Sequence, residues 1–192
     1  MAKEKSAEKK KEKEKYDKTD HQWTVDILDN EFRKESDRAV VILVASLLDE
    51  ALTSSLKSYL TPIASSSDEI FDGSNAPLGT FSSKINMIHR LGLISSRFCR
   101  DLHLVRKIRN SFAHNIFGCT FENGSVKSRI DELIKSAIGA KIDKKEAELP
   151  DGHKGNFIVI TSHMLYRLND IREECKNIPD CGLEFFYHEL KN

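Results

Sequence analysis

Residues 36–60 restrict the fold of this chain more than any other segment. Apolar side chains recur across the whole segment with the spacing of one helix face. Ser36 is a typical helix N-cap, Asp37 suits the positively polarised first turn, and Pro62 ends the helical pattern. The apolar band comprises Val40, Val41, Leu43, Val44, Leu47, Leu48, Ala51, Leu52, Leu56 and Tyr59. This width predicts that the segment is the main hydrophobic helix of the protein.

Helical spacing or helix-boundary residues recur along the rest of the chain. Thr80 or Ser82 is the expected N-cap of one helix, which should stop at Gly92. Besides the 36–60 segment, helices are expected over residues 23–32, 80–91, 95–116, 130–138, 156–176 and 183–190. We therefore predict an all-α fold, a single compact domain of about 6–8 helices with at most one small β-hairpin.

Two segments between the expected helices contain residues that predict a particular local structure. Asn123-Gly124 is the best hairpin signal in the chain, because this dipeptide favours the tight turn between two short strands. In the irregular region 62–80, Ile70 and Phe71 are expected to pack as a lid. The predicted organisation is a charged tail over residues 1–19, a helical domain over 20–178, and a terminal helix or tail over 179–192 that packs on the domain.

Charge composition limits the possible partners. The chain has 30 Lys and Arg residues against 30 Asp and Glu residues, so its net charge gives no long-range attraction to nucleic acid. Residues 3–15 carry seven lysines and four glutamates, which leaves the remainder slightly acidic. This balance argues against a general DNA-binding body, since such binding depends on neutralising phosphates. We interpret the tail as a solvated segment, with a nucleic-acid-binding arm as the alternative.

The spacing of the cysteines and the hydropathy of the chain indicate the cellular compartment of the protein. The cysteines are dispersed without the close spacing of a zinc site, and the histidines are equally scattered. No apolar leader is present, and the longest apolar run, 39–45, is far shorter than the about 20 residues of a membrane span. We expect a cytoplasmic protein without metal, cofactor or membrane contact. Free thiols are expected at Cys99, Cys119, Cys175 and Cys181.

Residues 101–114 concentrate the potentially reactive side chains. On a helical wheel one face is apolar, formed by Val105, Ile108, Phe112 and Ile116 with Leu102 and Leu104 at its edges. The opposite face gathers His103, Lys107, Asn110 and His114. Arg109 lies at the border, roughly 140° from His114. We expect the outward stripe to bind an anion or another subunit, with His103, Arg106 and Lys107 as candidate binding residues.

Two roles remain open for Arg109 and His114. The planar guanidinium of Arg109 can bind a phosphate, and the imidazole of His114 can transfer a proton near neutral pH. Together with Asn110 they could therefore promote the attack of a ribose 2′-hydroxyl on its phosphate without a metal ion. Alternatively, Arg109 pairs with Asp49 or Glu50 while His114 interacts with the negative end of its own helix. The residues assigned a structural role are the polar ones inside the 36–60 helix: Arg38, Asp49 and Glu50. Common nucleotide-binding loops, zinc-protease motifs and helix-turn-helix signatures are all missing from the sequence.

Four blocks of sequence resemble one known family. Residues 38–52, 76–85, 90–94 and 101–114 are similar, in that order, to the mannitol operon repressor (MltR-like) family of bacteria. The resemblance runs from about residue 30 to residue 175. It implies an all-helical transcriptional regulator that represses mannitol utilisation. Because the family has no recognisable DNA-binding motif, it also implies action through partners or a dimer surface.

A shorter resemblance concerns residues 109–114 alone. They match the R-x4-H motif of HEPN domains, helical dimers in which this motif forms a ribonuclease or RNA-binding cleft, and Asn110 occupies the favoured position after the arginine. This resemblance implies a metal-independent endoribonuclease with Arg109, Asn110 and His114 in the catalytic site. We rank a non-enzymatic, homodimeric regulator first and the HEPN-like protein second. An interaction module whose Arg109 and His114 are purely structural comes third.

Overall fold

The structure, a computed structural model, describes residues 32, 34–65, 67–115, 117–137 and 152–180. Its helices are α3 (Asp37–Tyr59), α4 (Phe81–Arg90), α5 (Ser96–His114), α6 (Gly124–Ala137) and α7 (Gly152–Glu174). Within these residues no strand is present, and the all-α prediction is confirmed for this part of the chain. The tail over residues 1–19, residues 23–31 of the first expected helix and the helix expected over 183–190 lie outside the described residues.

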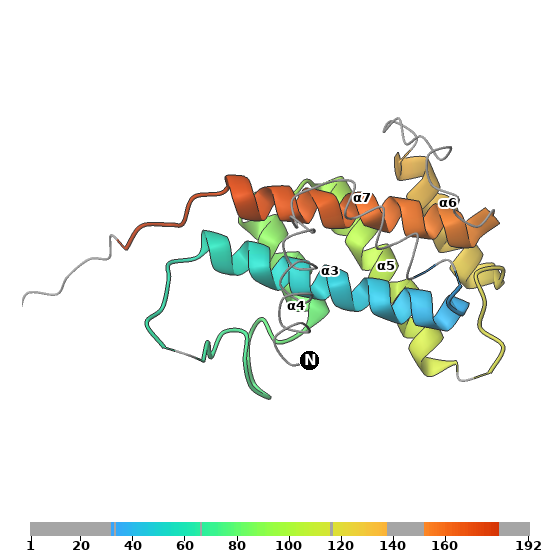
Figure 1. Cartoon of the computed structure of the whole chain (residues 1–192), viewed down its shortest axis with the longest axis horizontal. Helices are drawn as coiled ribbons and strands as arrows, with labels where there is room; N and C mark the ends of the chain where they lie inside the picture. Colours follow the sequence, from blue (N-terminus) through green and yellow to red (C-terminus); the bar gives the residue numbers. More distant parts are fainter. Residues whose placement is uncertain (1–31, 33, 66, 116, 138–151, 181–192) are drawn as a thin grey trace, which may run out of the picture.

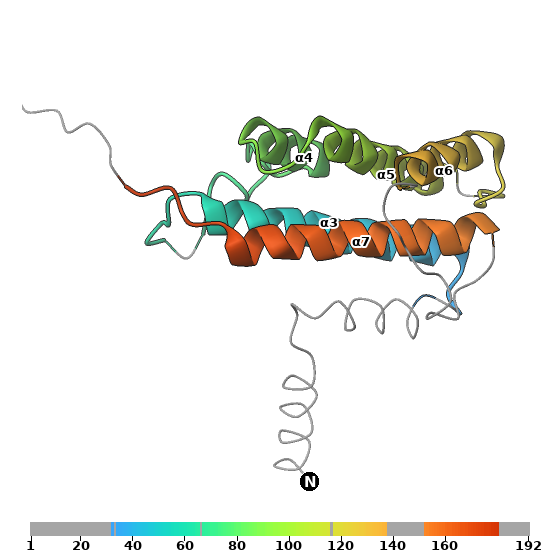
Figure 2. The ribbon, with the colours of Figure 1, turned by 90° about the horizontal axis from the view of Figure 1, so that it is seen from above.

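The helices form two layers (Figures 1 and 2). α3 and α7 lie side by side and run in the same direction, while α4, α5 and α6 follow one another across the second layer. The buried hydroxyl of Ser55 joins the helices of the first layer, because it donates a hydrogen bond of 2.7 Å to the carbonyl of Leu168. α3 contacts α4, α5 and α7, while α5 contacts α3, α4 and α6, so these two helices connect the layers.

α3 has the boundaries that its sequence predicts. The Ser36 hydroxyl accepts a hydrogen bond of 3.2 Å from the Ala39 N–H, and the helix ends three residues before Pro62. By length and composition α3 is also apolar enough to cross a membrane, which the short uninterrupted run at residues 39–45 did not suggest. The core helix of a bundle has the same composition, and in this structure half of the relevant stretch is buried against neighbouring helices.

The irregular region before α4 agrees with its prediction only in part. Phe71 is buried and lies under the Lys57 ammonium group, 5.1 Å from the ring centroid, whereas Ile70 is exposed. Only one of the two expected lid residues therefore packs on the core. Thr80 is the N-cap of α4 and exchanges hydrogen bonds with Ser83 in a capping box.

The hairpin expected at Asn123-Gly124 is wrong. The Asn123 carbonyl accepts a hydrogen bond of 2.7 Å from the Lys127 N–H, so this dipeptide begins α6 instead of joining two strands. The Asn123 side chain accepts a further bond from the Thr120 N–H. The deciding feature is the spacing of Val126, Ile130 and Leu133, all of them buried, which is helical and places them on one face.

Three aromatic rings join the two layers where α3, α6 and α7 begin and α5 ends. Phe121 lies between Phe112 and Phe157, with ring-centroid distances of 5.5 Å and 5.3 Å. All three side chains are almost completely buried. We call these three residues the aromatic junction; it fixes the end of α5 against the first layer.

Candidate functional site

α5 buries the face that its sequence predicts. The residues expected on the apolar face, Leu102, Leu104, Val105, Ile108 and Phe112, are all buried, while Ile116 lies outside the described residues. Ser95 caps the helix by accepting a hydrogen bond from the Phe98 N–H at 3.2 Å. This anchoring turns the remaining side chains of α5 toward α3, toward α4 or toward solvent, and so determines which of them share a site.

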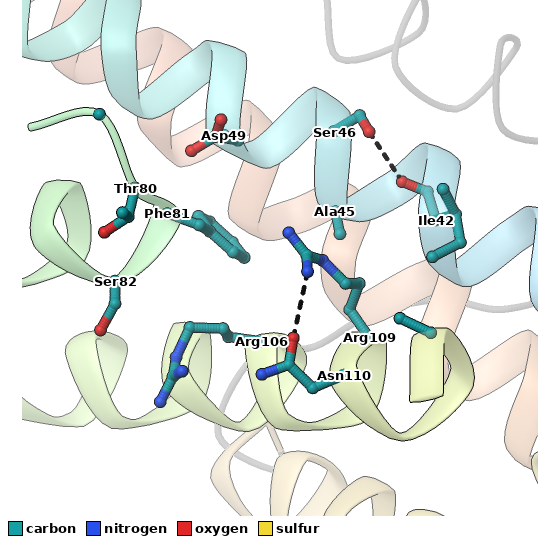
Figure 3. Close-up of a pocket in the computed structure, with 12 residues that line it drawn as sticks. Ile42, Ala45, Ser46, Asp49, Thr80, Phe81, Ser82, Arg106, Arg109 and Asn110 are labelled. Carbon is teal, nitrogen blue, oxygen red and sulfur yellow. Dashed lines mark hydrogen bonds between the residues drawn. The ribbon is translucent and has the colours of Figure 1, made fainter. Parts of the chain in front are cut away.

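A cavity of about 560 Å³ lies between α3, the start of α4 and α5 (Figure 3). Its size is within the range of small-molecule sites. We call it the cationic cavity, because the charged groups among the described residues that line it are two arginines and one carboxylate. Its lining comprises Ile42, Ala45, Ser46, Asp49, Gly79, Thr80, Phe81, Ser82, Arg106, Arg109, Asn110 and Ala113.

The two arginines of the cationic cavity differ from ordinary structural arginines. Arg109 extends from α5 toward α3, and its Nη1 atom donates a hydrogen bond of 3.2 Å to Asn110 Oδ1. Arg106 extends along α5 toward the start of α4, and its buried Nε atom has no hydrogen-bond acceptor within the described part of the chain. Among the described residues neither guanidinium forms an ion pair with a carboxylate.

The expected ion pair between Arg109 and Asp49 or Glu50 is not formed. Asp49 Oδ2 instead lies 3.0 Å from the Nζ atom of Lys84, a buried lysine on α4, and Glu50 is exposed. The partner is a lysine because α4 packs alongside α3 and carries Lys84 on its inner face. The sequence did hold a signal for it: Lys84 has helical spacing to Phe81 and Ile88 on the apolar side of α4.

The candidate binding stripe of α5 does not act as one surface. Arg106 lines the cavity, Lys107 is exposed and outside the cavity lining, and His103 faces α4. His103 Nε2 lies within hydrogen-bond distance of Asn86 Oδ1, at 3.0 Å, and Nδ1 is buried without a partner among the described residues. Desolvation lowers the pKa of His103, and the positive charges of Arg106 and Lys107 lower it further.

The end of α5 is held by a residue from α3. Arg38 donates one hydrogen bond to the Phe112 carbonyl and a second, of 2.6 Å, to the Asn115 carbonyl. These carbonyl groups at the end of α5 therefore already interact with a cation. His114, the last residue of α5, is exposed and is not part of the cavity lining. The three residues of the R-x4-H motif are therefore divided between the cavity and the surface.

The described residues contain no group of three metal-ligating side chains. Cys99, Cys119 and Cys175 are free thiols, and burial raises the pKa of Cys99 and of Cys119. Cys181 lies outside the described residues. A raised pKa keeps a thiol protonated and unreactive, so neither Cys99 nor Cys119 is a candidate nucleophile.

Comparisons with known proteins give no match: no protein-family model, curated protein or solved structure is significantly similar to this chain. The resemblances to the MltR-like family and to HEPN domains thus stay predictions. Several cavity residues were not anticipated from the sequence, among them Ser46, Thr80 and Ser82. Isolated hydroxyl residues in separate helices give no pattern in a sequence, and only packing brings them to one site.

Proposed function

We propose that this chain is an MltR-like regulatory protein of the bacterial cytoplasm, which modulates transcription through a partner or a dimer surface and is not an enzyme. The observation that carries the proposal is the make-up of the cationic cavity. Among the described residues its lining includes no histidine, cysteine or tyrosine, and the one carboxylate among them, Asp49, is already paired with Lys84. Such a lining binds a charged ligand well but offers little for proton transfer.

Exposed apolar residues next to the cavity support a protein partner. Ile42, which lines the cavity, is 36% exposed, and the neighbouring Leu43 is 45% exposed. Both lie on α3, whose opposite face is buried against neighbouring helices. Apolar side chains beside positively charged groups are typical of contact surfaces, and a second copy of this chain is the partner we propose.

Transcript levels test the regulatory proposal. A strain lacking the gene is complemented with the wild type, with an Arg106→Ala/Arg109→Ala variant, or with Lys107→Ala. Lys107→Ala is the matched control, because it removes a positive charge from α5 outside the cavity. We expect the wild type and the control to repress the same operon and the double variant to lose most of that repression. If no operon responds to the wild type, the regulatory proposal is wrong.

A second candidate function is a HEPN-like ribonuclease or RNA-binding protein. The observation that favours it is the hydrogen bond between Arg109 and Asn110, which holds the first two motif residues together at the cavity. His114 follows one helical turn after Asn110 at the exposed end of α5, where a second copy would complete the site.

The ribonuclease candidate is tested by incubating RNA with the protein in the presence of a metal chelator. Cleavage by the wild type, lost in both Arg109→Ala and His114→Ala, is the expected result for a HEPN-like enzyme. Light scattering on the same samples gives the oligomeric state, which this mechanism requires to be a dimer. Equal behaviour of the wild type and both variants would eliminate this function.

A further inference from the structure

The cationic cavity holds more positive charge than its own side chains balance. Asp49 is paired with Lys84, which contributes its charge from outside the lining, so neither Arg106 nor Arg109 has a carboxylate partner within the described residues. Arginines that serve only stability are normally paired when they lie between packed helices. Two half-buried guanidinium groups without carboxylate partners among the described residues are therefore available to an anionic ligand.

Other donors surround the same space. Thr80 and Ser82, at the start of α4, both line the cavity. Thr80 accepts from the Ser83 N–H, and the N–H groups of Phe81 and Ser82, earlier in the same turn, have no partner within the helix. The partial positive charge of this helix terminus adds to that of the two arginines. Asn110 and Ser46 supply further polar groups on α5 and α3.

Two buried polar atoms of the lining, one donor and one acceptor, have no hydrogen-bond partner among the described residues. Arg106 Nε is a buried donor without an acceptor, and Asp49 Oδ1 is a buried acceptor without a donor, in each case among the described residues. Unpaired buried groups of this kind cost free energy. A ligand relieves both if it brings a negatively charged acceptor to the arginines and a hydroxyl donor toward Asp49.

We propose that the cationic cavity binds a small phosphate monoester that also carries hydroxyl groups, and that this ligand is the effector of the regulator. The phosphate interacts with Arg106 and Arg109 beside the start of α4, and a hydroxyl group of the ligand donates to Asp49. A small ligand fits better than a nucleic-acid backbone, because the cavity lies between helices and has the volume of a small-molecule site. The effector role rests on the proposed regulatory function, whereas binding of the ligand can be measured whether or not the protein is a regulator.

Isothermal titration of the full chain tests the binding. The probes are glycerol 3-phosphate and ribose 5-phosphate, with inorganic phosphate and the unphosphorylated glycerol and ribose alongside them. We expect both esters to bind at least about tenfold more tightly than their unphosphorylated forms. Their affinity should decrease as the salt concentration increases. Arg106→Ala and Arg109→Ala should each weaken binding by about tenfold or more.

Three further variants separate charge, geometry and fold. Lys107→Ala removes an exposed charge of α5 outside the cavity and should change the affinity less than about twofold. Arg109→Lys keeps the charge but loses the planar fork, so its affinity should fall between those of the wild type and Arg109→Ala. Asp49→Asn replaces the carboxylate that accepts from the ligand hydroxyl with a neutral amide, so it should weaken binding of the two esters more than binding of inorganic phosphate. Circular dichroism confirms that each variant is folded before its affinity is compared.

The results distinguish failure of this inference from failure of the regulatory proposal. If neither ester binds the wild type, or if both bind the arginine variants equally well, the inference is overturned whatever the transcript data show. Arginine-dependent binding of a single-stranded RNA that the esters do not displace also overturns it, in favour of an RNA site. Arginine-dependent binding of the esters supports the inference even if no operon responds.

Discussion

Arg38 and Arg109 show how differently this fold uses the same side chain. Arg38, on α3, donates to two carbonyl groups at the end of α5, beside the closely packed aromatic junction. Arg109, on α5, extends back toward α3 and bonds only the neighbouring Asn110 among the described residues. The two arginines therefore extend between α3 and α5 in opposite directions. Arg38 binds carbonyl groups at the end of α5, whereas Arg109 lines the cationic cavity.

The difference separates what stabilises the fold from what is available for function. Around the aromatic junction the backbone of the loop before α6 is also bonded, because Asp37 Oδ2 accepts from the Phe121 N–H at 3.2 Å. In the cationic cavity, by contrast, the arginines remain without carboxylate partners among the described residues. Natural proteins often retain such unsatisfied groups where a ligand binds, at some loss of stability.

The largest effect is expected at the aromatic junction. Phe121→Ala removes a ring that is only 2% exposed and contacts two other rings, so we expect the free energy of unfolding to fall by about 3–5 kcal/mol. Urea denaturation followed by circular dichroism measures this loss. Met87→Ala, at an exposed position of α4, is the control and should cost far less. A loss below about 1 kcal/mol for Phe121→Ala would show that the junction is not a stabilising core.

Arg38→Ala is expected to have the next largest effect. It removes two charge-assisted hydrogen bonds and leaves the end of α5 without its cation, so the free energy of unfolding should fall by about 2 kcal/mol. Arg38→Lys should restore only part of this loss, because a lysine cannot place two donors in the same fork. Hydrogen exchange should locate the change at the last turn of α5. An unchanged exchange rate there would contradict the capping role.

The sequence predicted helices and buried faces more successfully than it predicted partners. The apolar spacing in α3 and α5 determines which faces are buried. Every described residue of the predicted α5 face is buried, whereas Leu43 of the predicted α3 band is exposed, and Ser36 is the cap that was expected. Periodicity contains this information because each helix must bury one stripe of its own surface. The hairpin failed for a related reason: a local turn signal at Asn123-Gly124 was preferred over the helical spacing that follows it.

Partners of charged groups are a different problem. The carboxylate of Asp49 could be matched with any cation that packing brings near it, and Arg109 was chosen although Lys84 is the residue that pairs with it. The choice depends on how α4 lies on α3, which no local pattern encodes. For the same reason the cationic cavity could be anticipated only through its α5 residues, Arg106, Arg109 and Asn110, and not through Ser46 or Thr80.

Arg109→Ala should leave stability almost unchanged, in contrast to Arg38→Ala. Because Arg109 has no carboxylate partner among the described residues, its loss should change the free energy of unfolding by no more than about 0.5 kcal/mol. The same urea experiment measures it beside Arg38→Ala. A decrease of about 2 kcal/mol in the free energy of unfolding, as expected for Arg38→Ala, would mean that Arg109 is a structural residue. The cationic cavity would then not differ in this respect from the end of α5 beside the aromatic junction.

The smallest effect concerns pH and His103, on the side of α5 that faces α4. Its pKa is lowered, mainly by desolvation, so the unfolded chain takes up a proton at a higher pH than the folded chain does. Stability supplied by the neutral imidazole is therefore complete above the unfolded pKa of about 6.5 and decreases as the pH falls from there toward the folded pKa. His103→Gln should reduce this acid sensitivity in urea denaturation between pH 7 and pH 5. His114→Gln, at an exposed position, is the matched control. If both variants lose stability with acid as the wild type does, the neutral His103 does not contribute to the packing of α5 on α4.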